Sequence, residues 1–137
     1  MKKQDLRNAL KALEGAKFSK LAAKDVITVI TEVRKIRPHV EQLQKDLDML
    51  EMSMEDDMTK EMRSKAKSFE TLSEAERMEI NEYFISHRRK RNESEKLLCE
   101  ENVDVELNRF SPEIIENLIA SNDFTGQQLS DVFNVFF

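Results

Sequence analysis

Apolar residues that recur every seven positions form the clearest pattern in the chain. One series is Val26, Val33, Val40, Leu47 and Met54, and the other, offset by three, is Val29, Ile36, Leu43 and Leu50. These are the a and d positions of about four heptads, which are typical of a helix that buries one narrow seam. The pattern predicts a long helix over Lys20–Met54, with Ser19 as its N-cap.

One residue interrupts this helical pattern without shifting its register. Pro38 lacks a backbone N–H and crowds the carbonyl group of Arg34, four residues earlier. It falls at heptad position f, on the side away from the seam. We expect it to kink the helix while the apolar register is kept, and the alternative is a break into two helices near Arg37.

A second long helix is predicted over Glu74–Glu101. Ser73, followed three residues later by Glu76, has the form of a capping box, which marks a helix start. The two long helices have similar lengths, so we expect them to pack as an antiparallel, coiled-coil-like hairpin.

Shorter helices are predicted around the two long ones. The chain begins with an amphipathic pattern over Gln4–Glu14, followed by Gly15, where a left-handed residue would end the helix. A third helix is expected over Met58–Glu70.

Two helix starts are visible near the end of the sequence. Ser111 and Pro112 form an N-cap followed by a proline at the first helical position. Thr125 and Gln128 have the spacing of a second capping box.

The period changes from helical to alternating at residues 103–107. Val103, Val105 and Leu107 are separated by polar residues, as in a half-buried strand. A single strand leaves its backbone groups unpaired. The segment therefore either packs on the helices as extended chain or pairs as a short strand across a subunit interface.

These elements predict an all-α fold in a single helical domain, residues 1–137. Within it we expect a helical hairpin core at 1–101 and an appendage at 102–137. The composition agrees, since only 2 glycines and 2 prolines accompany 36% charged residues. Narrow seams on long helices leave apolar surface uncovered, which favours a homodimer or higher oligomer.

The net charge of −5 belongs mainly to the end of the chain. Residues 1–50 contain 11 basic and 7 acidic side chains, whereas residues 102–137 contain 1 and 6. The latter segment also holds five of the eight phenylalanines. An acidic, Phe-rich segment suits docking on an apolar surface, either within the chain or on a protein partner. The candidate partner contacts are Phe124, Phe133, Phe136 and Phe137.

A basic run at residues 87–91 offers a second kind of site. Its candidate phosphate contacts are Arg88, Arg89, Lys90 and Arg91. Consecutive helical residues point in all directions, so one ligand cannot meet them all, and a solvated face with charge pairing is the expected reading. Pairs four apart, Arg89 with Glu93 and Arg91 with Glu95, support that expectation.

No residue set predicts catalysis, a cofactor or a metal. One cysteine and two histidines are too few for a structural zinc site, and two isolated glycines cannot form a phosphate-binding loop. We expect Cys99, beside Leu97 and Leu98, to be a buried small apolar residue. Because no set of nucleophile, base and orienting residue can be named, we do not expect an enzyme. The sequence contains neither a membrane-spanning apolar run nor a signal-peptide pattern, and we expect a cytoplasmic protein.

The order of elements resembles a group of small uncharacterised helical proteins of tailed bacteriophages and prophages. The resemblance spans most of the chain and includes the alternation over Glu101–Leu107 and the Ser-Pro-Glu helix start at Ser111. It implies a structural, assembly or accessory role in the bacterial host cytoplasm or the virion. It carries no catalytic or binding residue to this chain.

The leading functional hypothesis is therefore a non-catalytic module for protein–protein interaction. The alternative is a nucleic-acid-associated accessory protein. It would use the basic run together with the cations of the N-terminal segment, which are Lys2, Lys3, Arg7, Lys11, Lys17, Lys20 and Lys24.

Overall fold

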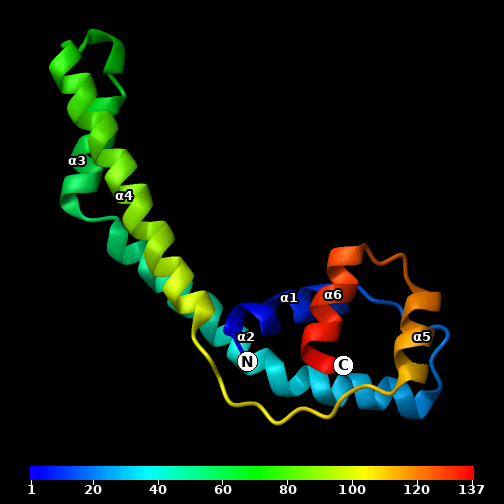
Figure 1. Ribbon diagram of the computed structural model, residues 1–137. Helices are drawn as coiled ribbons and strands as arrows, with labels where there is room; N and C mark the ends of the chain where they lie inside the picture. The colour runs from blue at the N-terminus through cyan, green and yellow to red at the C-terminus, as the bar shows by residue number, and fades with distance from the viewer. The chain divides into compact units, whose positions relative to one another are not determined.

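The computed structural model describes residues 1–137, and its regular elements are all helices (Figure 1), as the sequence predicts. Its elements are α1 (Lys3–Glu14), α2 (Ala23–Met54), α3 (Asp57–Ala66), the short 3-10 helix η1 (Phe69–Thr71), α4 (Glu74–Glu100), α5 (Pro112–Ser121) and α6 (Gly126–Phe136). No helix combines the length and the apolar character that crossing a membrane requires.

Helix α2 differs from its prediction at the start and at the proline. It begins at Ala23, where the carbonyl group of Ala22 accepts from two helical N–H groups, so the prediction of Ser19 as N-cap is wrong. It continues without interruption through Pro38, so the alternative of a break near Arg37 is also wrong. Losing one hydrogen bond on an exposed face does not end a helix whose other face is buried.

The predicted N-caps of the last two helices are confirmed. The Ser111 hydroxyl accepts from the N–H of Ile114, with Pro112 directly after the cap. The Thr125 hydroxyl accepts from the N–H of Gln128, whose side chain accepts from the Thr125 N–H in return.

At the start of α4, only one of the two hydrogen bonds of the predicted capping box is formed. The Ser73 hydroxyl accepts from the N–H of Glu76, but the Glu76 carboxylate accepts from that hydroxyl and not from the Ser73 backbone.

Two shorter predictions need correction. The helix expected over Met58–Glu70 is divided into α3 and η1, because the chain turns after Ala66. Gly15 has φ −93°, so α1 ends without a left-handed residue. Its N–H instead donates to the carbonyl group of Leu13.

The chain divides into two compact units, and this division differs from the expected hairpin core and appendage. Unit 1 comprises Met1–Leu43 and Cys99–Phe137, and unit 2 comprises Gln44–Leu98. Residues 102–137 are therefore not an appendage, because they belong to the same compact unit as α1. The boundaries fall inside α2 and inside α4.

Unit 1 has a well-buried apolar core to which its two ends both contribute. α1 packs against α6 (Figure 1), and residues from α2 and α5 complete the cluster. Phe136 is fully buried and stacks on Phe110, with ring centroids 4.5 Å apart. The Phe110 N–H also donates to the Phe136 carbonyl group. The acidic, Phe-rich segment thus packs on its own chain.

Residues 103–107 form no strand and run as extended chain. Val103, Val105 and Leu107 are half-buried against the core of unit 1. The alternation of apolar and polar residues therefore places the apolar side of the extended chain against the helices. An isolated bridge between Lys2 and Asn102 satisfies backbone groups next to this segment. Within one chain the segment is packed extended chain, and its pairing across a subunit interface stays a prediction.

A buried carboxylate holds the extended segment to α2. Glu32 is only 1% exposed, and its two oxygens accept from the N–H and the side-chain amide of Asn108, at 2.9 and 3.1 Å. Lys35 donates to the same carboxylate at 2.8 Å. Burial raises the pKa of Glu32, but the hydrogen bonds from Lys35 and Asn108 outweigh it and hold the pKa below the usual 4.5.

Unit 2 has a much smaller core. Met62 and Ile80 are its buried apolar residues, and Thr59 is buried with them. Beyond Ile80, the half-buried face of α4 includes His87 and Arg91. Polar side chains therefore lie where this face meets the end of α2, at the contact of His87 with Met54. The elements are compatible with a hairpin, and the coiled-coil pairing stays a prediction.

Candidate functional site

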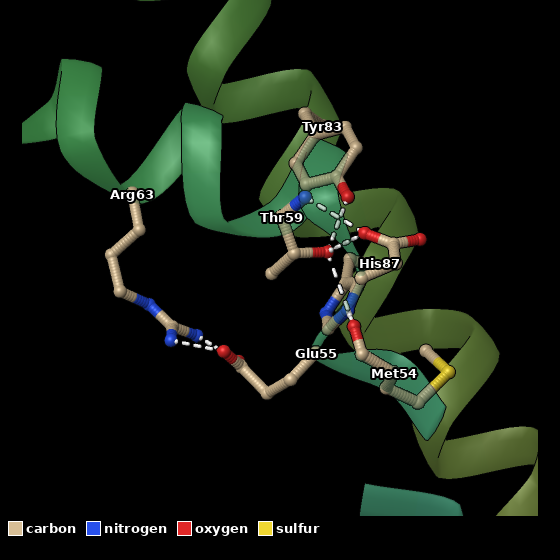
Figure 2. Close-up of polar contacts among 7 residues, drawn as sticks. Met54, Glu55, Thr59, Arg63, Tyr83 and His87 are labelled. Carbon is tan, nitrogen blue, oxygen red and sulfur yellow. Dashed lines mark hydrogen bonds and ion pairs between the residues drawn. The ribbon is translucent and has the colours of Figure 1, made fainter. Parts of the chain in front are cut away.

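A polar cluster connects the end of α2, the start of α3 and the middle of α4 in unit 2 (Figure 2). Its centre is the hydroxyl of Thr59, which is fully buried. That oxygen lies 2.7 Å from Asp56 Oδ1, 3.1 Å from the Met54 carbonyl oxygen and 2.5 Å from the Tyr83 hydroxyl. One side chain of α3 thus contacts both neighbouring helices.

The protons of this cluster can be assigned from its acceptors. Asp56 when ionised and the Met54 carbonyl oxygen can only accept, so the single Thr59 hydroxyl proton is shared between these two acceptors and the Tyr83 hydroxyl donates to Thr59. Asp56 also accepts from the Thr59 N–H at 2.8 Å and so caps α3. The hydrogen bonds from the Thr59 side chain and backbone lower the pKa of Asp56.

His87 is fixed next to this chain of hydroxyl groups. Its Nε2 lies 2.9 Å from the carbonyl oxygen of Met54, and its ring stacks on that of Tyr83 at 5.8 Å. A carbonyl oxygen can only accept, so Nε2 carries a proton and donates it. That nitrogen is therefore engaged with the main chain and is not placed as a base against either hydroxyl.

Arg63 and Glu55 form a two-point contact at the edge of the cluster (Figure 2). Both terminal nitrogens of the guanidinium donate to the carboxylate, at 2.7 and 2.5 Å. Arg63 lowers the pKa of Glu55, and Glu55 raises the pKa of Arg63, because each stabilises the charged form of the other. The pair closes the turn between α2 and α3.

Replacing Thr59 with valine should destabilise unit 2. The change keeps the shape but removes the buried hydroxyl that accepts from Tyr83 and donates to Asp56, so we expect a loss of about 1–3 kcal/mol in the free energy of unfolding. Tyr83 is the only tyrosine and there is no tryptophan, so its fluorescence during urea unfolding reports on this site. Thr59→Ser retains the hydroxyl and is the control. Equal losses in the two variants would show that the methyl group, and not the hydroxyl, matters.

A hollow of about 230 Å³ lies beside the cluster and collects part of the basic run. Arg88 and Arg91 line it from α4 together with His87, and Arg63 lines it from α3. Lys90 lines a different hollow, and Arg89 lines neither. The structure therefore brings together two of the four predicted phosphate contacts and adds Arg63.

The charge pairing expected along α4 is present in part. Arg91 lies 3.7 Å from Glu95, whereas no ion pair joins Arg89 to Glu93. Two acids, Glu51 and Glu55, line the same hollow as the arginines and offset their charge. At the other end of the chain, Lys3 is paired with Glu101.

The predicted partner contacts lie in unit 1, and they are not equally accessible. Phe136 is fully buried in the core, where it packs against Phe110, so its prediction as a partner contact is wrong. Phe124 and Phe133 are half-buried against that core. Phe137 is 52% exposed and meets Phe133 edge to face. Cys99 is buried, as predicted.

Sequence reasoning missed the cluster around Thr59. The pairing of Asp56 with Thr59 has the spacing of an N-cap, and Tyr83 and His87 are four residues apart on one face of a helix. These two signals are local and were readable. The contact between them depends on how α3 and α4 pack, which no spacing encodes.

The structure contains no group of three or more histidine, cysteine or acidic side chains placed to hold a metal ion. The chain matches no protein-family model, no curated protein and no solved structure.

Proposed function

We propose that this protein is a non-catalytic module for protein–protein interaction that associates with itself through the helices of unit 2. The observation that supports this most is the balance of apolar residues in that unit. Six large apolar side chains are exposed there by half or more, which are Met49, Met52, Met58, Met78, Ile85 and Leu97. Only Met62 and Ile80 are buried.

A single exposed apolar residue is ordinary on a protein surface. A unit in which exposed large apolar side chains outnumber the buried ones is unusual. Methionine, which supplies four of the six, repacks easily and suits a surface that meets another chain. The polar cluster agrees with a non-catalytic role. The hydroxyls of Thr59 and Tyr83 and the Nε2 of His87 all form hydrogen bonds that hold the helices of unit 2 together.

Sedimentation analysis tests the proposal directly. We expect a mass above the 16.1 kDa of one chain at micromolar concentration. A clean monomer over the whole concentration range would contradict self-association. The measurement should use the full chain, because both units share α2 and α4.

The hollow lined by Arg63, Arg88 and Arg91 favours one alternative, an accessory protein that contacts nucleic acid phosphates. Repeating the sedimentation run with a labelled DNA or RNA oligonucleotide at about 50 mM salt tests it, because phosphate contacts weaken steeply as salt is added. Absence of co-sedimentation at low salt removes this alternative. The acids Glu51 and Glu55 in the same hollow make us place it second.

We further propose, from the order of elements alone, a structural, assembly or accessory role in a tailed phage or prophage, in the host cytoplasm or the virion. Gene neighbourhood is the test. Neighbouring head or tail genes would support this role, and an operon of metabolic enzymes would count against it.

A further inference from the structure

One outward face of α4 carries a regular stripe of exposed side chains within unit 2. Its members are Glu74, Met78, Glu82, Ile85, Arg89, Asn92 and Lys96, and the exposed Glu93 and Glu100 lie along its edge. Spacings of three, four and seven place them on the same side of a helix. The half-buried face of α4, which includes Ile80 and His87, is a different one.

The charges nearest Ile85 on this stripe are of opposite sign on its two sides. Glu74 and Glu82 lie on the N-terminal side, and Arg89 and Lys96 lie on the C-terminal side, where Glu93 and Glu100 at the edge of the stripe offset part of the positive charge. None of the four charged members of the stripe makes a hydrogen bond or ion pair within the chain. Ile85, at the middle of the stripe, is 58% exposed, and Met78, between Glu74 and Glu82, is 57% exposed. The stripe thus combines an apolar centre with unpaired charges of opposite sign at its two ends.

Such a stripe is complementary to itself when two copies run antiparallel. If Ile85 meets Ile85 of a second copy, each residue faces the one equally far from Ile85 in the other direction. Lys96, eleven residues after Ile85, then faces Glu74, eleven before it. Arg89, four residues after, lies within about 1.5 Å along the axis of Glu82, three before.

We propose that α4 of one copy pairs antiparallel with α4 of a second copy, centred on Ile85, with Glu82–Arg89 and Glu74–Lys96 contacts between chains. Each contact occurs twice, as two-fold symmetry requires. A parallel pair in register would place like charges together along the whole stripe, which is unfavourable. This inference rests on the proposed self-association and names its surface and direction.

Disulfide trapping distinguishes this arrangement from others. In a Cys99→Ala background, Ile85→Cys should form a linked dimer in a glutathione redox buffer, because the two copies of residue 85 lie opposite each other. Met78→Cys is the matched control, since its side chain is equally exposed and on the same face. In the antiparallel pair the two copies of residue 78 are fourteen residues apart along the axis, about 21 Å, and should not link.

The outcomes are decisive in both directions. Linking at residue 85 alone supports the proposal. Linking at both residues indicates a parallel pair, and linking at neither indicates another surface; either result overturns it. Circular dichroism of each variant confirms that the helices are intact.

Charge reversal provides a second test. Glu82→Lys or Arg89→Glu alone should weaken association on the order of tenfold, because two attractive contacts become repulsive. The double variant should restore most of the affinity. Glu79→Lys is the control, because it makes the same charge change on a side of α4 outside the stripe. Equal effects of Glu79→Lys and Glu82→Lys would show that net charge, and not this pairing, controls association.

The two proposals can fail separately. A mass above one chain, with no link at residue 85, leaves self-association standing and removes this surface. A monomer at every concentration removes both.

Discussion

Replacing Phe136 with alanine should lower the free energy of unfolding by about 3–5 kcal/mol, the largest effect that we expect from a single substitution. The ring is fully buried between elements from both ends of the chain. It also stacks face to face on Phe110, with an angle of 3° between the ring planes. Alanine would leave a cavity where α6 meets the core.

Phe137→Ala is the matched control for this prediction. It removes the same side chain from the next position, where the ring is 52% exposed. We expect a loss well below that of Phe136→Ala, because little area is removed from the core. Urea unfolding followed by circular dichroism measures both variants. Similar losses would contradict the packing described for unit 1.

Replacing Glu32 with alanine should cost about 2–3 kcal/mol, because the N–H of Asn108 loses its acceptor in a buried place. The carboxylate is the one group that ties α2 to the extended segment by two hydrogen bonds from Asn108. Lys35 is partly exposed and can turn to water, so its loss adds little. Urea unfolding measures this cost. A loss below that of an exposed substitution such as Glu41→Ala would contradict it.

The pH dependence of the same site gives an independent check. The pKa of Glu32 lies below its usual 4.5 in the folded chain, so the ionised carboxylate stabilises the fold above that value. This stabilisation is lost as the pH falls through the lower, folded pKa. The difference in unfolding free energy between the protein and Glu32→Gln should therefore shrink from about pH 6 to about pH 3. A difference that stays constant or grows on acidification would show that the charge is not what matters.

Local signals in the sequence predicted local structure well. The caps at Ser111 and Thr125 are observed as expected, because a cap depends on residues within one helical turn. The d positions Val29, Ile36 and Leu43 are all fully buried, since a helical period fixes which residues share a face. The all-α class follows from the same periodicity.

Predictions that joined distant parts of the chain did less well. The heptad pattern indicates a narrow seam, but Glu32 at position g is buried beside it, because Asn108 arrives from seventy-six residues away to satisfy its charge. Sequence favoured Phe136 as a partner contact, and packing of α6 on α1 placed it in the core. Of the basic run, only Arg88 and Arg91 share a hollow, and Arg63 joins them from another helix.

The sequence by itself determined that this chain is helical, where most of its helices begin and end, and which face of α2 is apolar. Each of these depends on backbone hydrogen bonds and side-chain spacing within a few residues. Only the tertiary structure decided that both ends of the chain build one core, that a threonine joins three helices, and which apolar side chains stay exposed. Burial depends on which elements meet, and that choice is made by the whole chain at once.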